Sequence, residues 1–216
     1  MTSVSPLYLI VLMVVMGLLP FFLMMVTSYV KIVVVTTLVR NALGVQQIPP
    51  TMVMNGLAII LSVFIMAPVG LETWRLVENK QMPDNPLTAE MAVIAQEASE
   101  PLRKFLRRNT ETYVLKSFVA AAQRIWPPEI RGLISEESFL LLIPSFVISE
   151  LTKAFKIGFL LYLPFIAIDL IISNILLAMG MMMVSPMTIS LPFKLLLFVT
   201  LEGWLKICQG LLFSYG

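Results

Sequence analysis

The chain has 216 residues, of which 58% are hydrophobic and 13% charged, and its mean hydropathy is +0.91. Because soluble domains carry roughly 25% charged residues, this composition excludes an ordinary soluble domain and indicates an integral membrane protein. A net charge of +2 gives no reason to expect binding to nucleic acid. The chain has no histidine and a single cysteine, Cys208, which excludes histidine base catalysis, histidine-containing zinc sites and an intrachain disulfide.

The first candidate membrane span covers residues 7–30, which is longer than the roughly 20 apolar residues that a spanning helix needs. We expect Pro20 to kink this helix rather than end it. No lysine or arginine precedes the apolar run and no small-residue cleavage site follows it. The segment is therefore predicted to be retained rather than removed as a signal peptide.

A loop and a second candidate span follow. In residues 40–50 (RNALGVQQIPP), Gly44 is a candidate left-handed helix cap and the two prolines stop any helix, so a defined loop is expected. The second candidate span covers residues 52–71 and is interrupted late by Pro68.

Charged residues gather in the middle of the chain. Of the 28 charged residues, 19 lie between residues 72 and 137, nine basic and ten acidic, so this region is predicted to be a water-exposed insert. The apolar residues between 111 and 126 have the spacing of an amphipathic helix. A helix is expected over residues 88–98, with Thr88 as its cap. A second is expected over residues 102–108, after Pro101, which opens it, and a third over residues 111–126, which Pro127 ends.

The last third of the chain is apolar again. After a candidate cap at Ser135, an apolar run continues through Pro144, and the third and fourth candidate spans cover residues 157–179 and 191–213. The sequence thus predicts an all-α membrane protein of long, kinked hydrophobic helices with a helical polar insert. Its predicted parts are an N-terminal hydrophobic hairpin (1–71), a polar extracytoplasmic insert (72–138) and a C-terminal hydrophobic hairpin (139–216).

The orientation of these parts follows from the basic residues in short loops. Lys31 and Arg40 follow the first span with no acid beside them, which places that loop in the cytoplasm. The polar insert is then extracytoplasmic, and the turn between the third and fourth spans returns to the cytoplasmic side.

That turn contains three consecutive methionines, Met181, Met182 and Met183. Because Gly180 breaks the preceding helix, and Pro186 and Pro192 oppose a simple helical continuation, the methionines are expected in a turn rather than on a helix face. Methionine is unbranched and polarizable, so such a cluster can close around objects of different shape and act as a seal. The alternative is lipid-facing filler, and composition alone leaves both open.

Several ionisable side chains fall inside apolar segments, where they are costly and need partners. We expect Lys194 either to pair with a carboxylate of another helix or subunit, for which Glu150 of an adjacent copy is preferred, or to extend its amine to the membrane interface. Asp169 and Asn174 are candidates for polar contact with a neighbouring helix. Proton relay by Asp169 is the less favoured alternative.

Motifs for enzymatic chemistry are absent from the sequence. It contains no GxxxxGK[ST], HExxH or GxSxG, and without histidine the usual pair of nucleophile and base is missing. No cofactor or metal and no enzymatic activity are expected, so any energy for transport has to come from a source outside this chain.

Five stretches of the sequence together resemble one family. They are NALGVQQIPP (41–50), MAPVG (66–70), SELTKAF (149–155), GFLLYLPFIAIDLIISNILLAMGMMMVSP (158–186) and ISLPFKLLLFV (189–199). These stretches are similar to the export-gate membrane proteins of type III secretion, the SctR proteins of virulence injectisomes and their flagellar counterpart FliP. The resemblance covers nearly the whole chain and is weakest in the polar insert.

This resemblance implies a core subunit of an export gate in the bacterial inner membrane. About five copies would assemble with two smaller membrane proteins, the S-type and T-type subunits, into a pseudo-helical conical pore within a larger export apparatus, and unfolded effector and needle proteins would pass through it. The resemblance places a methionine gasket on residues 181–183 and an inter-subunit charge pair on Glu150 and Lys194. It also implies that the apparent spans are held largely at or above the outer face of the membrane. The retained N-terminus suggests the virulence branch.

Two other functions stay open on the residues alone. The first is a small multispanning ion or solute transporter that uses Asp169 as its coupling residue. The second is a membrane enzyme or its anchor, against which the missing nucleophile motif argues.

Overall fold

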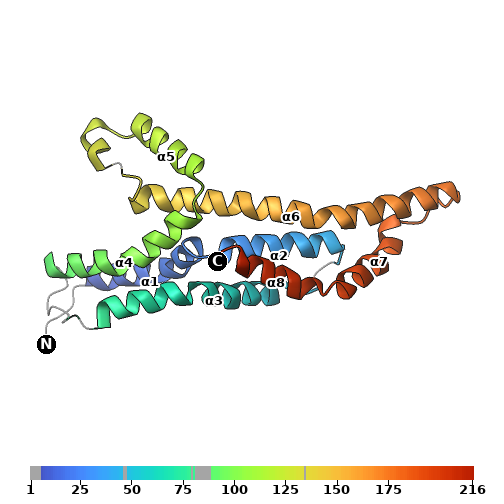
Figure 1. Ribbon diagram of the computed structural model, residues 1–216, viewed down its shortest axis with the longest axis horizontal. Coiled ribbons are helices and arrows are strands. Elements are labelled where there is room, and N and C mark those ends of the chain that lie inside the picture. Colours follow the sequence, from blue (N-terminus) through green and yellow to red (C-terminus); the bar gives the residue numbers. More distant parts are fainter. Residues whose placement is uncertain (1–5, 46–47, 79, 81–88, 134) are drawn as a thin grey trace.

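The protein is built from helices. A computed structural model describes residues 6–45, 48–78, 80, 89–133 and 135–216, and within these ranges it contains helices and turns but no strand. The predicted all-α fold class is thereby confirmed. The elements are α1 (Pro6–Met25), α2 (Tyr29–Leu43), α3 (Thr51–Glu78), α4 (Ala89–Asn109), α5 (Thr112–Ile125), the short 3₁₀ helix η1 (Pro128–Leu133), α6 (Phe139–Ala178), α7 (Pro186–Thr200) and α8 (Gly203–Phe213) (Figure 1).

The longest helix, α6, is the axis of the molecule. Its 40 residues extend about 60 Å at the usual rise per residue. α2 packs along α6, α3 packs against α2 and α4, and α5 folds back over the start of α6 (Figure 1). α7 and α8 return from the far end of α6 toward the start of α2, so the C-terminus lies in the middle of the molecule.

Six prolines lie inside described helices and do not end them. A proline removes one backbone donor, but packing and the remaining hydrogen bonds keep a long helix continuous. The prediction that Pro101 opens a new helix is therefore wrong, because Pro101 is a buried residue within α4. The second span is likewise uninterrupted at Pro68. The prolines within helices are Pro20, Pro68, Pro101, Pro144, Pro164 and Pro192.

The first apolar segment bends at residues 26–28, where α1 and α2 meet at 67°. α1 continues through Pro20, so this proline does not end the helix, as predicted, and the kink expected there stays a prediction. At the bend, Val26 and Ser28 are buried, and the Ser28 hydroxyl donates a hydrogen bond to Ser62 Oγ on α3 at 3.1 Å. The bend between α1 and α2 is therefore accompanied by a contact with α3.

The last apolar segment is also bent, because α7 and α8 meet at 58°. Glu202, at the corner, has a φ of 52°, in the left-handed region that non-glycine residues seldom adopt. A Cβ on the next residue, Gly203, would lie 2.3 Å from the Phe198 ring, so only glycine allows this close approach. The single helix predicted over residues 191–213 is therefore wrong.

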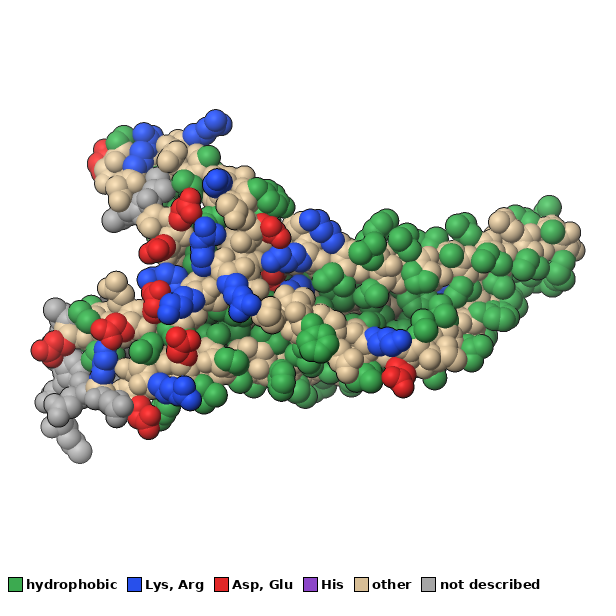
Figure 2. All heavy atoms as spheres, viewed as in Figure 1, with side chains coloured by type: hydrophobic (Ala, Val, Ile, Leu, Met, Phe, Trp, Pro, Cys, Tyr) green, Lys and Arg blue, Asp and Glu red, His purple; other side chains and the backbone are tan. Residues whose placement is uncertain are grey.

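Two helices, α3 and α6, are each long and apolar enough to cross a membrane. If each bent pair is counted as one span, the number rises to four, which is the number that hydropathy predicted. The side chains on the outer part of α6 and on α7 stay largely apolar and exposed, and Figure 2 shows them as a broad apolar surface away from the charged end of the molecule.

Two hydrophobic clusters hold the helices together. The first lies between α2, α3, α6, α7 and α8 and includes Ile32, Val35 and Phe165. The second joins α4 and α5 to the start of α6 and includes Leu106 and Phe146. Both clusters include residues of α6, so this helix connects the two cores.

Several boundaries agree with the sequence and others do not. Gly44 caps α2 with a φ of 74°, and the predicted amphipathic helix is α5, so both predictions are confirmed. α6 begins after Ser138 rather than Ser135. Thr88 lies outside the described residues. α3 continues to Glu78, past the end of the predicted N-terminal hairpin, and the division into three parts stays a prediction.

Candidate functional site

The methionine turn (residues 179–185) joins α6 to α7 at one end of the molecule (Figure 1). α6 ends in a Schellman motif, in which Gly180 has a φ of 70° and donates its N–H to the Leu177 carbonyl at 3.0 Å. The N–H of Met181 donates to the Leu176 carbonyl at 2.9 Å. α7 then begins at Pro186, so the three methionines lie in a turn and not on a helix face.

The side chains of this turn lie away from the rest of the chain. Met181, Met182 and Met183 are 40%, 80% and 99% exposed. Burying one large apolar side chain contributes about 1.5–3 kcal/mol, which these exposed residues do not gain within one copy of the chain. The turn therefore presents an apolar surface that other molecules would have to cover.

Below the turn, a polar contact joins α6 to α7. Lys194 Nζ donates to Asp169 Oδ2 at 2.6 Å and to the Ala42 carbonyl, at the end of α2, at 3.3 Å. Asp169 Oδ1 accepts a hydrogen bond from the Ser190 hydroxyl at 2.6 Å. We call Asp169, Ser190 and Lys194 the distal tie. Because Lys194 is nearly fully buried, its ammonium depends on these oxygens for the solvation it has lost.

A second polar group surrounds Glu150 on α6, which is fully buried. Its Oε2 lies 3.3 Å from Lys31 Nζ on α2 and accepts a hydrogen bond from the Tyr215 hydroxyl, and its Oε1 lies 3.4 Å from Lys153 Nζ. Phe105 of α4 stacks on the Tyr215 ring, with 5.9 Å between the ring centroids. We call these five residues the basal cluster.

Tyr215 contacts both members of the buried ion pair in the basal cluster. Its ring lies under Lys31, whose Nζ is 3.5 Å from the ring centroid, in a cation–π contact. Burial, and then the charge and hydrogen bond of Glu150, raise the pKa of Tyr215 well above its ordinary value. The hydroxyl therefore stays protonated and acts as the donor to Glu150.

Glu150 and Lys194 do not meet within one chain. Lys194 pairs with Asp169, which lies 19 positions after Glu150 on the same helix, or about 28 Å along its axis. As long as α6 stays helical, a pair between Glu150 and Lys194 therefore requires two copies of the chain. That pair stays a prediction.

Three members of the basal cluster, Lys31, Phe105 and Tyr215, were missed as site residues. Lys31 was assigned to a loop, but it lies in α2 and is 1% exposed, so it is not a loop charge for the positive-inside rule. Its position in an unbroken run of valine and isoleucine was a signal that it needs a buried partner. The sequence has no such signal for Tyr215, because its place depends on the bend between α7 and α8.

Asn174, the other residue predicted to make a polar contact, lies exposed on α6. Within the described part of the chain, its side chain has no hydrogen-bond partner. Nor do the described residues contain a group of three or more cysteine, aspartate or glutamate side chains that could hold a metal ion.

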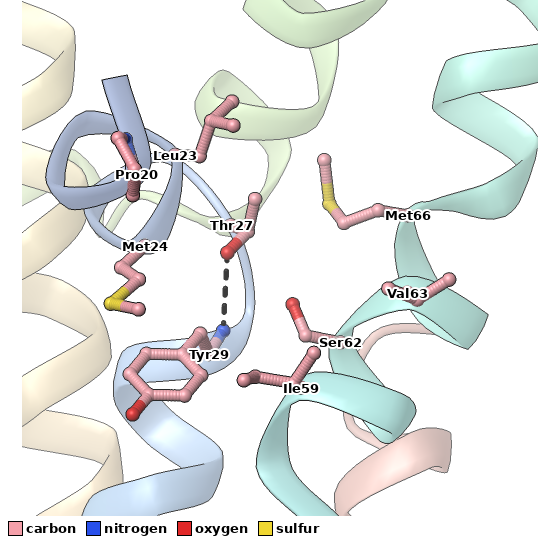
Figure 3. A pocket seen from close by; sticks show the side chains of 9 residues that line it. All are labelled: Pro20, Leu23, Met24, Thr27, Tyr29, Ile59, Ser62, Val63 and Met66. Carbon is pink, nitrogen blue, oxygen red and sulfur yellow. Dashed lines mark hydrogen bonds between the residues drawn. The ribbon is translucent and has the colours of Figure 1, made fainter. Parts of the chain in front are cut away.

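An apolar pocket of about 350 Å³ lies at the bend between α1 and α2 (Figure 3). Figure 3 shows Met24, Ile59 and Met66 around it, with the hydroxyls of Thr27 and Ser62 as polar groups. Thr27 Oγ1 accepts the Tyr29 N–H at 3.5 Å. Since no charged side chain lines this pocket, it is suited to an apolar group and not to an ionic ligand.

The sequence matches a known family over nearly its whole length, because the model of the FliP family covers residues 12–211. The chain belongs to the FliP family. The resemblance to export-gate proteins of type III secretion is thereby confirmed.

Individual relatives agree with this assignment. The chain is 51% identical to Yop proteins translocation protein R of Yersinia pestis, and the match covers 96% of this chain and 95% of that protein. It is 50% identical to virulence protein YscR of Salmonella typhimurium, over 93% and 92% of the two chains. It is 48% identical to hypersensitivity response secretion protein HrcR of Ralstonia nicotianae, over 96% of each. Members of this family are structural components of a secretion apparatus, so the site is to be understood as part of an assembly.

Proposed function

We propose that this chain is a core subunit of the export gate of a bacterial type III secretion system, in its virulence branch, and forms the channel through which unfolded effector and needle proteins leave the cell. The observation that carries the proposal is the methionine turn. Three flexible, apolar side chains are exposed at the end of a long helical hairpin, on a chain that belongs to the FliP family.

In the closed gate, methionine turns of several copies would meet at a common axis. Their burial against one another would contribute the free energy that each turn lacks in a single chain. Methionine rotates about three single bonds, so an arriving polypeptide could part the cluster and then be enclosed by it. A seal of this kind limits leakage of ions and leaves no rigid obstacle.

The assembly would contain about five copies of the chain together with the smaller S-type and T-type membrane subunits, as members of a larger export apparatus. It would be located in the inner membrane and project to the periplasmic side. No catalytic role and no cofactor are part of the proposal. The exposed apolar surface of outer α6 and α7 supports it, since such a surface needs cover from lipid or from other subunits.

The pair of Glu150 and Lys194 would join adjacent copies. Both residues are buried and have partners in their own chain, namely Lys31 and Asp169. Forming the pair would therefore be an exchange of partners and not the capture of a free charge. The exchange would conserve the number of ion pairs only if Lys31 and Asp169 also gained new partners. Substituting either of these two residues should therefore affect assembly.

Native mass spectrometry of the chain, co-expressed with its candidate S-type and T-type partners and extracted in mild detergent, tests this function. We expect a defined complex with several copies of this chain and fewer of at least one partner. A stable monomer or dimer that ignores those partners would contradict the proposal.

The role of the turn is tested by changing residues 181–183 together to alanine in the assembled complex. We expect assembly to persist and the resting leak of small ions to rise, because alanine cannot fill the space at the axis. Met187→Ala is the matched control, since Met187 is also an exposed methionine but lies on α7 outside the turn. An unchanged leak would contradict the seal.

A transporter that uses Asp169 is the second candidate. Asp169 is half-exposed and lies in a helix long and apolar enough to span a membrane, which favours it. Its pairing with Lys194 argues against it, because a cation would have to displace a buried ammonium. This candidate predicts solute flux through the purified chain alone that Asp169→Asn abolishes.

A further inference from the structure

The end of the chain closes the base of the helical hairpin that carries the methionine turn. This hairpin runs from Glu150 along α6, through the turn, and back along α7 and α8 to Tyr215. The hydrogen bond from the Tyr215 hydroxyl to Glu150 joins residues 65 positions apart and lies at the open end of the hairpin. The distal tie joins the same two arms closer to the turn.

Tyr215, which follows α8, contacts residues of three other helices. Its hydroxyl binds Glu150, one face of its ring meets Lys31, and Phe105 stacks on the ring as well. These three partners belong to α6, α2 and α4. The position of the C-terminus beside the start of α2 in Figure 1 agrees with this arrangement.

α8 itself is held mainly along one face. Ile207 and Leu211 are buried in the first hydrophobic cluster, whereas Leu205 and Phe213 are exposed. α8 meets α7 at a corner where Glu202 has left-handed backbone geometry. Among the residues that the structure describes, Tyr215 is the one that ties the end of α8 to the buried ion pair.

We propose that Tyr215 is a positioning residue of the gate: its hydroxyl, by its hydrogen bond to Glu150, holds the end of α8 against α6 and so fixes where the methionine turn lies. We call this hydrogen bond the clasp. This inference rests on the proposed function, because the position of the turn affects conduction only if the turn is a gate. When this hydrogen bond is lost, α8 is held by the apolar contacts of Ile207 and Leu211 and can move about the corner at Glu202.

The test is Tyr215→Phe in the full chain, which keeps the ring, its stacking and its cation–π contact and removes only the hydroxyl. Hydrogen exchange of the α8 amides, residues 203–213, should become about tenfold faster, the factor expected when a hydrogen bond to a charged group is lost. Tyr162→Phe is the matched control, since the Tyr162 hydroxyl, on α6, has no hydrogen-bond partner in the described part of the chain. It should leave the exchange unchanged.

The second measurement is the resting leak of small ions through the assembled gate. If Tyr215 positions the turn, Tyr215→Phe raises the leak while the amount and size of the complex stay the same. Unchanged exchange in α8, or faster exchange with an unchanged leak, would overturn the inference and leave the gate function intact. Absence of any complex with the unaltered chain would instead refute the gate function, and with it the role of Tyr215 in gating.

A second variant covers the case in which Tyr215→Phe does not accumulate. Phe105→Leu removes the stacked ring and retains the Tyr215 hydroxyl, so it loosens the clasp from the side of α4. Exchange in α8 should again become faster and the leak should rise, both by less than in Tyr215→Phe. If neither changes, the clasp does not position the turn.

Discussion

Removing Lys31 should strongly destabilise the fold, because Glu150 would remain buried without its principal counter-charge. In Lys31→Met the carboxylate keeps Lys153, at 3.4 Å, and the Tyr215 hydroxyl. Loss of one member of a buried ion pair costs about 3–5 kcal/mol. Since Lys153 remains, we expect a loss near the lower limit, about 3 kcal/mol in the free energy of unfolding.

Thermal unfolding in detergent, followed by intrinsic fluorescence, measures this loss. For a chain of this length 1 kcal/mol corresponds to roughly 2–4 °C, so the midpoint should fall by about 6–12 °C. The double variant Lys31→Met with Glu150→Gln should recover about half of the loss, because the buried charge is gone and the amide oxygen still accepts from Tyr215.

Lys156→Met is the control for this experiment, since Lys156 is an exposed lysine on α6 and its loss should change stability by less than about 0.5 kcal/mol. The reasoning is refuted if Lys31→Met costs no more than this control. It is also refuted if the losses of the two single variants add up in the double variant, because the charges would then not be coupled.

Three further changes test other parts of the structure. Lys194→Ala leaves Asp169 without its counter-ion and should lower the yield of the complex before it affects conduction; a stable complex of the correct size in native mass spectrometry would contradict this. Gly203→Ala should cost about 1–3 kcal/mol in the free energy of unfolding by overpacking, whereas Gly210→Ala on the same helix, where a Cβ meets open space, should cost nothing in a thermal melt. Because the pKa of Tyr215 is raised on folding, its stabilising contribution is complete below the unfolded value near pH 10 and is lost as the pH rises above it. Above pH 10 the unaltered chain should therefore lose stability by about 1.4 kcal/mol per pH unit more steeply than Tyr215→Phe, and parallel curves would contradict this.

Sequence reasoning was successful where one local signal decides the structure. Gly44 adopts the left-handed backbone geometry predicted for it, and α6 ends before Gly180, which was predicted to break that helix. The apolar spacing of residues 111–126 gave α5 almost to the residue. In each case the deciding interaction lies within one or two helical turns, so a single sequence contains it.

Predictions from the sequence were wrong or incomplete where contacts between residues far apart in the chain determine the structure. The first apolar segment bends at residues 26–28, where Ser28 bonds to Ser62 on α3, and no local signal predicted this bend. Pro101 was expected to start a helix and instead lies inside one. The partners of Glu150 and Lys194 within the chain are Lys31 and Asp169. These pairs depend on how α2, α6 and α7 pack, which no spacing in the sequence contains.

The orientation of the chain in the membrane illustrates the same limit. Lys31 and Arg40 together predict a cytoplasmic first loop, yet Lys31 is an internal counter-ion of Glu150. Arg40 alone remains, and its guanidinium donates to Thr51 Oγ1 at 3.0 Å and to the Pro49 carbonyl at 3.4 Å. A basic residue that completes a buried ion pair gives no information about sidedness, so the predicted orientation now rests on one charge.

The position of the distal tie has a consequence for how the gate would open. Asp169 lies nine positions before the end of α6, so about 14 Å of the hairpin extends beyond the tie. In the described part of the chain, no side-chain hydrogen bond or ion pair joins the two arms beyond that point, and apolar side chains such as Leu176 lie between them. A passing polypeptide could then part these ends by sliding apolar surfaces over one another, without breaking a buried ion pair. We therefore expect opening to leave the hydrogen bond from Ser190 to Asp169, which joins α7 to α6, intact.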